Sequence, residues 1–244
     1  FEPDVVFGFS SGDDAAAGNS TWFTQMFGIA VNDGSDTQMS QSHSCQNLAE
    51  HDIEHVQTVG NIGAQISGTG AKTETYHLTI SDFDANGFSV TPSASTNSDD
   101  WFYLAINLGG LSASLFTIDT PTSTGVVSYD TPAFTPQFGM TVGSFMTARG
   151  TISGDSGVMS HGIGMFDGTE EWFALHRHEW YSTGSGNSAY PSSLTHTYAL
   201  AAMDPIAETV MAATLDSFDS LGFNLNYSAV DATPRMAFGL AIEA

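Results

Sequence analysis

The sequence predicts an all-β protein built from two tandem, homologous β-sandwich modules of the jelly-roll-like kind. Three observations support this: a repeat that spans the chain, segments in which apolar and polar residues alternate, and turn-forming residues between those segments. The first module is expected at residues 1–110 and the second at residues 111–244. Each module holds about eight turn-bounded apolar runs, which is typical of a sandwich.

Two copies of one module are indicated by four pairs of similar segments that follow one another in the same order. The offset between the partners stays within 133 to 135 residues, so the matches are collinear along the chain. Collinear self-similarity at a nearly fixed spacing is the signature of a duplicated structural unit. The pairs are 1–3 with 134–136, 28–34 with 162–168, 83–88 with 218–223, and 103–106 with 238–241.

Alternating residues predict the strands themselves. Apolar side chains occur at every second position in 76–80 of the first copy and in 223–227 of the second, as expected for strands with one buried face. The segment 83–88 joins two such strands through the turn formers Asp84, Asn86 and Gly87. Gly87 suits a positive φ angle, and Gly222 is expected to repeat its role in the second copy.

One segment carries conflicting signals. Residues 198–215 are rich in alanine and methionine, which by propensity alone favour a helix. Their counterpart in the first copy, 63–80, contains glycines and threonines that favour strand, turn and strand. Because both copies should share one structure, we predict hairpins at both places.

The region between the copies contains two further predicted strands, at 115–118 and 126–129. They come directly before the second copy, whereas the first copy has no equivalent, so its opening strands are absent. We expect either that the sequence is a fragment or that a neighbouring chain supplies these strands by swapping or strand addition.

Composition excludes several classes of function. The chain has 4 Lys+Arg against 27 Asp+Glu, a formal net charge of −23. Binding to nucleic acid or to an anionic membrane needs clustered basic residues, so neither is expected. The apolar runs are of strand length, so membrane insertion is not expected either. With 41% hydrophobic residues the chain has enough apolar side chains for a core, and its single cysteine, Cys45, excludes an intrachain disulfide.

The order of several motifs resembles a β-rich repeat found in virion structural proteins of tailed bacteriophages. The resemblance implies a virion or extracellular location and an assembly role, with further copies of the chain and other virion proteins as partners. It rests on structural rather than catalytic motifs. These motifs are 121–125, 134–136, 162–164, 217–227 and 238–241 in the second copy, and 1–7 and 103–110 in the first.

Four residues are candidates for ligand binding. Trp172 and Trp180 flank a polar stretch in which His176 and His178 would point to one face of a strand. Tryptophans among polar neighbours suit contact with a partner or a host surface glycan. Two histidines are too few for a structural zinc site. The segment 82–87 matches only half of a calcium loop. Neither a metal site nor a cofactor is therefore predicted.

We therefore expect a non-enzymatic structural component of a bacteriophage virion, in its tail, a fibre or a surface decoration. One alternative is an adhesin module that binds a glycan or a receptor, for which exposed Trp172 and Trp180 would provide the surface. A second is a polysaccharide-degrading tail hydrolase, which requires two carboxylates at a working separation in a cleft. No catalytic residue is assigned, because no nucleophile elbow, phosphate loop or zinc-protease motif occurs.

Overall fold

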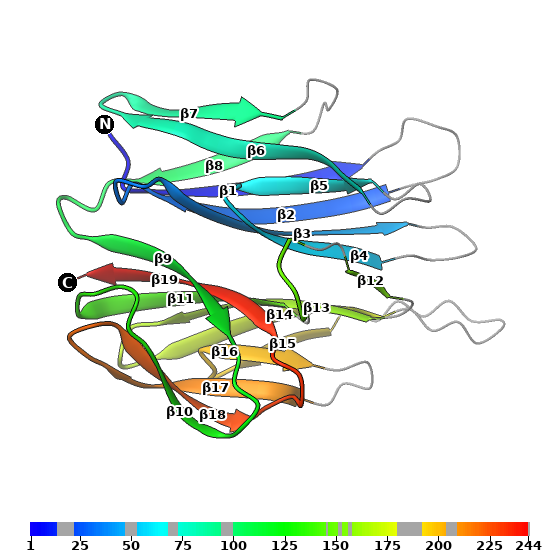
Figure 1. Ribbon diagram of the computed structural model, residues 1–244, viewed down its shortest axis with the longest axis vertical. Helices are drawn as coiled ribbons and strands as arrows, with labels where there is room; N and C mark the ends of the chain where they lie inside the picture. Colours follow the sequence, from blue (N-terminus) through cyan, green and yellow to red (C-terminus); the bar gives the residue numbers. More distant parts are fainter. Residues whose placement is uncertain are drawn as a thin grey trace. The chain divides into compact units, whose positions relative to one another are not determined.

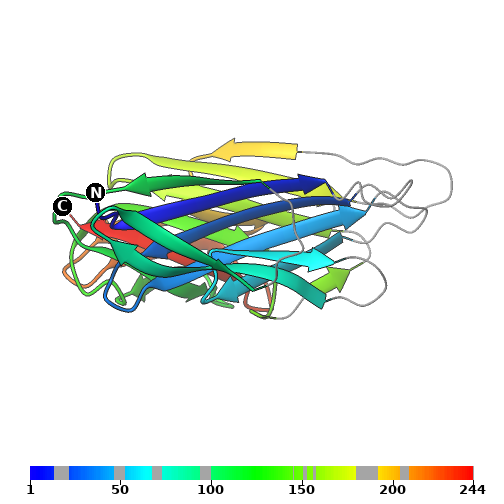
Figure 2. The same ribbon diagram turned by 90° about the horizontal axis from the view of Figure 1, so that it is seen from above.

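The computed structural model describes ten stretches of the chain: residues 1–13, 22–46, 53–67, 73–93, 100–144, 146–150, 153–155, 158–179, 192–203 and 209–243. Every regular element in these stretches is a β-strand, so the predicted all-β class is confirmed. The strands that neighbour one another pair in the antiparallel direction (Figures 1 and 2). None of the described residues forms a helix that could cross a bilayer.

Contacts between residues divide the chain into two compact units. Unit 1 comprises Phe1–Gly110 together with Arg149–Gly157, and unit 2 comprises Leu111–Ala148 together with Val158–Ala244. Each unit contains one six-stranded sheet and one smaller sheet.

Unit 1 has a six-stranded sheet in the order β12-β4-β3-β2-β1-β8 and a three-stranded sheet in the order β5-β6-β7. In Figures 1 and 2, β1, β2 and β3 run side by side in shades of blue. The strands are β1 (Val5–Asp13), β2 (Trp22–Val31), β3 (Thr37–Gln46), β4 (Ile53–Val59), β5 (Gly63–Ser67), β6 (Thr73–Asp84), β7 (Gly87–Pro92), β8 (Trp101–Ile106) and β12 (Ser153–Asp155).

Unit 2 has a six-stranded sheet in the order β15-β14-β13-β11-β19-β9 and a four-stranded sheet in the order β10-β18-β17-β16. Its strands are β9 (Ala113–Asp119), β10 (Gly125–Tyr129), β11 (Pro136–Ser144), β13 (Val158–Phe166), β14 (Glu171–Glu179), β15 (Ser192–His196), β16 (Leu200–Met203), β17 (Thr209–Phe218), β18 (Phe223–Ala229) and β19 (Met236–Glu243).

The two units share one strand order. Strands β4-β3-β2-β1-β8 of unit 1 follow one another as β15-β14-β13-β11-β19 do in unit 2, and β5-β6-β7 follow one another as β16-β17-β18 do. In the stretches that the structure describes, the units differ in three strands. Unit 2 adds β9 beside β19 and β10 beside β18, and unit 1 adds β12 beside β4.

Strand β12 reaches unit 1 from far along the chain. It pairs with β4, with Ser153 opposite His55. Just before it, the amide of Gly150 donates to the carbonyl of Gln57 at 2.8 Å, and Arg149 Nε donates to Gln57 Oε1 at 3.1 Å. Unit 1 therefore accepts an edge strand from the connection between β11 and β13, which the sequence did not predict.

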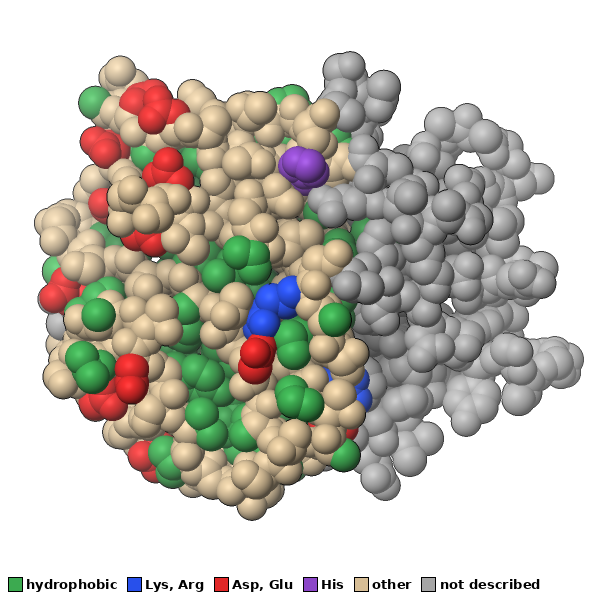
Figure 3. Space-filling view, viewed as in Figure 1, with side chains coloured by type: hydrophobic (Ala, Val, Ile, Leu, Met, Phe, Trp, Pro, Cys, Tyr) green, Lys and Arg blue, Asp and Glu red, His purple; other side chains and the backbone are tan. Residues whose placement is uncertain are grey.

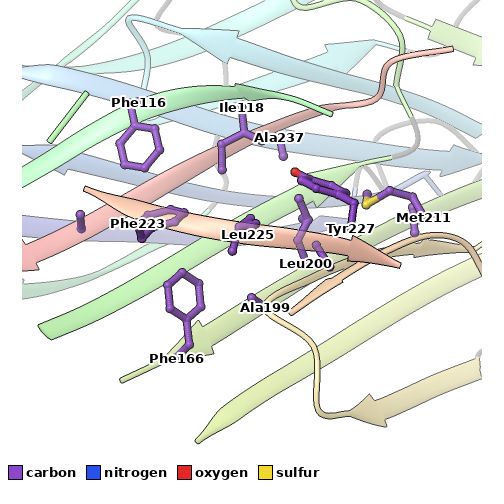
Figure 4. Close-up of a cluster of buried hydrophobic side chains, with 13 residues drawn as sticks. Phe116, Ile118, Phe166, Ala199, Leu200, Met211, Phe223, Leu225, Tyr227 and Ala237 are labelled. Atoms are coloured by element: carbon purple, nitrogen blue, oxygen red, sulfur yellow. The ribbon is translucent and has the colours of Figure 1, made fainter. Parts of the chain in front are cut away.

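The core of unit 2 is formed by side chains from both of its sheets. Figure 4 shows Phe116 and Ile118 of β9 facing Phe223, Leu225 and Tyr227 of β18. In the described part of unit 1, the corresponding cluster has fewer buried members, namely Val6, Ala30, Ile62, Leu78 and Ile80, and a separate cluster holds Val56, Ala64 and Ile66. Several hydrophobic side chains that pack against the first five residues are only partly buried.

Both hairpins that the repeat predicted are present. β5 pairs with β6, and β16 pairs with β17, so the helix propensity of 198–215 is overridden. The predicted common role of Gly87 and Gly222 is wrong. Gly87 has φ 153°, whereas Gly222 does not have a positive φ. Gly222 is needed because a Cβ there would lie 1.9 Å from the carbonyl oxygen of Tyr129.

The predicted match of 103–106 with 238–241 is displaced by one residue. In unit 1 Gly8 lies between Gly28 and Tyr103, and in unit 2 Gly143 lies between Gly162 and Ala237. Tyr103 is thus equivalent to Ala237 rather than to Phe238. A shift of one residue matters because it moves every side chain of a strand to the other face.

Candidate interaction surfaces

The predicted ligand-binding residues lie in or beside β14. Trp172 is 60% exposed, and its cross-strand neighbour Met165 on β13 is 43% exposed. His176 and His178 occupy β14 positions in phase with Trp172, and the backbone of His176 lies opposite His161. The side chains of His176 and His178, and the whole of Trp180, lie outside the described residues.

Hydrogen bonds order the turn that leads from β13 into β14. Asp167 Oδ1 accepts hydrogen bonds from the amides of Thr169 and Glu170 and from the Thr169 hydroxyl, at 2.7 to 2.9 Å. The Thr169 hydroxyl and these amides lower the pKa of Asp167 to about 2. Burial raises the pKa of Glu171, which begins β14. Trp172 is therefore presented beside a well-ordered turn.

A second surface lies on the side of unit 1 where unit 2 carries β9 and β10. We call it the open side of unit 1 and define it by β7 and β8. Among the described residues, β8 pairs only with β1, and β7 pairs only with β6. In unit 2 the equivalent strands β19 and β18 have neighbours on both sides. An edge without a neighbour presents backbone donors and acceptors to whatever approaches it.

Aromatic side chains from both sheets line the open side. The ring of Phe88 on β7 meets Tyr103 on β8 edge to face, with 5.3 Å between the centroids. Trp101 stacks beside Tyr103 at 6.4 Å. Gly63 leaves room for the indole, since a Cβ there would lie 2.0 Å from the Trp101 ring. All three aromatic residues pack against the buried core, yet each stays only partly buried.

The other face of β8 is also apolar. Phe102 is 66% exposed and Leu104 is 53% exposed, while Phe9, opposite Phe102 on β1, is 40% exposed. Burial and the neighbouring Tyr76 raise the pKa of Tyr103 to about 12, so its hydroxyl stays neutral at physiological pH. The surface in Figure 3 shows more acidic than basic side chains, as the net charge of −23 requires. The apolar character of β8 therefore contrasts with an acidic exterior.

No group of three or more His, Cys, Asp or Glu side chains suited to a metal ion occurs in the described stretches. The half-matching calcium segment 82–87 forms the tight turn between β6 and β7. There, Asp84 Oδ1 accepts the amide of Asn86 at 2.7 Å.

The sequence pointed to the open side only through the expectation that the first copy is without its opening strands. It did not identify Phe88, Trp101 and Tyr103 as a shared surface, because they come from strands of different sheets. Two signals were available in the sequence. One is the alternation along 88–90 and 101–105, and the other is the expectation that the first copy has no counterpart to 113–129.

No protein-family model, curated protein or solved structure matches this chain. Functional proposals therefore rest on the described geometry and on the sequence pattern.

Proposed function

We propose that this chain is a structural, non-enzymatic component of a bacteriophage particle, in its tail, a fibre or a surface decoration. It consists of two homologous β-sandwich modules of the jelly-roll-like kind and acts by contact with other proteins of the particle or with further copies of itself. The observation that carries the proposal is the repeated strand order, in which one unit is flanked on a side where the described part of the other has no neighbouring strand.

An open sheet edge is a place for assembly. Its backbone groups form the same hydrogen bonds with a strand from another chain as with a strand of its own. Soluble proteins usually blunt such edges with charged side chains, whereas β8 presents Phe102 and Leu104. Tandem modules also double the contacts that each chain offers, which raises avidity without new side chains. The motif order that resembles phage virion proteins supports the same role.

The test is to locate the protein in particles. An antibody raised against the chain is used for immunogold electron microscopy of virus-sized particles purified on a density gradient from the source culture. Labelling at one repeated position on the particle is expected. The proposal is wrong if the particles stay unlabelled while the chain remains in the fraction without particles.

The exposure of Trp172 favours a second candidate, an adhesin module that binds a host surface glycan. An exposed indole stacks well on a sugar ring, and Met165 extends the apolar surface beside it. Glycan-array binding that is lost in Trp172→Ala and kept in Leu221→Ala would support this function. Leu221 is 50% exposed in the same unit and provides the matched control. An array without a reproducible signal excludes this candidate for the glycans it carries.

A further inference from the structure

We propose that Glu171 forms a proton-sensitive link between the two sheets of unit 2, whereas Gln38 forms the equivalent link of unit 1 in a form that does not respond to pH. Each of these side chains belongs to the six-stranded sheet of its unit and hydrogen-bonds to the backbone of the smaller sheet at the same strand position. The link of unit 2 should therefore weaken as the pH rises. This device does not rest on the proposed assembly function.

Both links meet a β-bulge that the two units share. The pairing of β6 with β7 shifts directly after Ile80, and the pairing of β17 with β18 shifts directly after Leu215. Ile80 lies three residues before Phe83, as Leu215 lies three residues before Phe218, and each phenylalanine faces another one across its hairpin. Ile80 and Leu215 are thus equivalent. A bulge interrupts the ladder of backbone hydrogen bonds, so side chains can take over as partners there.

In unit 1 the link is the side-chain amide of Gln38 on β3, which is 4% exposed. Its Oε1 accepts the backbone amide of Ile80 at 2.7 Å, and its Nε2 donates to the carbonyl of Ile80 at 2.6 Å. Both ends of the side chain are therefore paired. An amide side chain carries no charge and does not titrate, so this link is the same in acid and at neutral pH.

In unit 2 a carboxyl group replaces the amide. Gln38 lies opposite Ala30, and at the equivalent place Phe173 lies opposite Gly164. Phe173 is buried and cannot form a hydrogen bond with its side chain. Glu171 comes two residues earlier and lies on the same face of β14. The link of unit 2 thus comes from the neighbouring inward position of the equivalent strand.

The carboxyl of Glu171 is enclosed between the sheets. The backbone amides of Leu215 on β17 and of Ala199, just before β16, hydrogen-bond to it. Its Oε2 is buried and has no hydrogen-bond partner among the described residues. A negative charge at such a place costs more free energy than a protonated carboxyl does. Burial accordingly raises the pKa of Glu171, and the two amides offset only part of that rise.

A raised pKa fixes the direction of the response. Folding favours the protonated form of Glu171, so the contribution of the link to stability is complete below the ordinary glutamate pKa of 4.5. That contribution is lost as the pH rises through the raised pKa. Acid therefore strengthens the contact between the sheets of unit 2, and neutral pH weakens it.

Other titratable groups lie on the segments around Glu171. They are the exposed Asp167 and Glu170 of the turn before it, the exposed Asp216 of β17, the half-buried Tyr198 after β15, and His196 of β15, whose side chain lies outside the described residues. The described residues of β16 are not titratable. A test of the link has to separate Glu171 from these groups.

Amide hydrogen exchange of the full chain reads both links separately. Exchange is followed by NMR from about pH 4 to about pH 8 and converted to protection factors, which removes the intrinsic effect of pH on exchange. The amide of Leu215 is expected to lose protection as the pH rises, whereas the amide of Ile80 keeps its protection. Carboxyl ¹³C titration in the same samples gives the pH at which Glu171 ionises. The proposal is wrong if Leu215 keeps its protection, or loses it at a pH where Glu171 does not titrate.

Exchanging the two side chains tests the cause. Glu171→Gln gives unit 2 the chemistry of unit 1, and the protection of Leu215 should become independent of pH. Gln38→Glu is the reciprocal change, and Ile80 should now lose protection as the pH rises. Glu170→Gln is the matched control, because it removes an exposed carboxyl next to Glu171 and should leave the Leu215 response in place.

A pH response of Leu215 that persists in Glu171→Gln belongs to one of the other titratable groups and overturns the proposal. If Glu171→Gln does not fold, the titration of the unaltered chain and the response of Ile80 in Gln38→Glu decide the question. An Ile80 amide whose protection stays constant in Gln38→Glu contradicts the equivalence of the two links.

Discussion

Phe88 of unit 1 and Phe223 of unit 2 occupy the same position in equivalent strands, and each lies opposite a phenylalanine across a hairpin. Phe223 is fully buried because Phe116 and Tyr129 enclose it. Phe88 is partly buried because the described part of unit 1 has no strands at those places. In a duplicated module, the burial of a residue is thus decided by neighbouring strands as much as by its own strand.

The largest effect is expected when this pair is truncated. Phe223→Ala should lower the free energy of unfolding by about 3–5 kcal/mol, as for a fully buried phenylalanine. Phe88→Ala should cost about 1.5 kcal/mol, because less apolar area is buried there. Urea unfolding of the two variants and the unaltered chain measures both losses. Equal losses would show that the open side of unit 1 is as well packed in solution as the core of unit 2.

Each unit has a glycine whose missing side chain leaves room for a backbone carbonyl, and replacing either one should be costly. A Cβ at Gly28 of β2 would lie 1.7 Å from the carbonyl oxygen of Ile62, and one at Gly164 of β13 would lie 1.9 Å from that of Ala199. Gly28→Ala and Gly164→Ala are each expected to cost about 3 kcal/mol or more, since backbone must move. Gly8→Ala is the control, because its Cβ would meet side chains and no backbone, Ile62 at 3.1 Å and Tyr103 at 3.5 Å. Gly28 and Gly164 are not matched positions of the repeat, since Gly28 matches Gly162 in the register above, so a negligible loss at either glycine would show only that the carbonyl beside it can move. Thermal unfolding measures all three.

The paired hydroxyls of Tyr129 and Tyr227 belong to unit 2. In unit 1, Pro92 takes the place of Tyr227. Tyr129→Phe leaves the buried Tyr227 hydroxyl without this partner and should cost about 1–2 kcal/mol. Adding Tyr227→Phe should recover part of the loss, because no hydroxyl then stays buried and unpaired. Urea unfolding measures both variants. If Tyr227→Phe lowers the free energy of unfolding again by as much as Tyr129→Phe did, the two residues act independently.

The same pair gives unit 2 an alkaline limit. Burial raises the pKa of Tyr129 to about 12, above the ordinary value of about 10. A raised pKa means that the neutral form is favoured by folding, so this contribution is complete below pH 10 and is lost as the pH rises through 12. Absorbance titration at the phenolate band should show Tyr129 ionising late, and Tyr129→Phe should reduce the amplitude of the step near pH 12, to which Tyr103 also contributes. Ionisation near pH 10 would contradict the buried pairing.

The smallest effect concerns the turn beside Trp172. The Thr169 hydroxyl is the main cause of the low pKa of Asp167, near 2, so Thr169→Val should raise that pKa toward the ordinary value of about 4. Since the pKa is lowered on folding, the turn's contribution to stability is present above pH 4 and is lost as the pH falls through 2. Carboxyl ¹³C titration by NMR measures the shift. An unchanged pKa in Thr169→Val would mean that the backbone amides alone hold the carboxylate.

Much of the fold was predictable because its causes are local. Alternation in 223–227 and turn formers in 83–88 act over a few residues, and the repeat transferred the hairpin of 63–80 onto the helix-like 198–215. The surface roles were less predictable. Trp172 was predicted to be exposed from its polar neighbours, and it is. The cluster of Phe88, Trp101 and Tyr103 was missed because it joins two sheets.

The sequence by itself determined the all-β class, the existence of a repeat and the positions of most strands, since these depend on periodicity and turn chemistry. The tertiary structure alone decided that 153–155 pairs with β4, that Tyr103 matches Ala237, and that Gly222 is required by Tyr129 rather than by its own φ angle. Each of these depends on contact between segments distant in the chain. Such contacts are set by strand register and backbone approach, which no local pattern encodes.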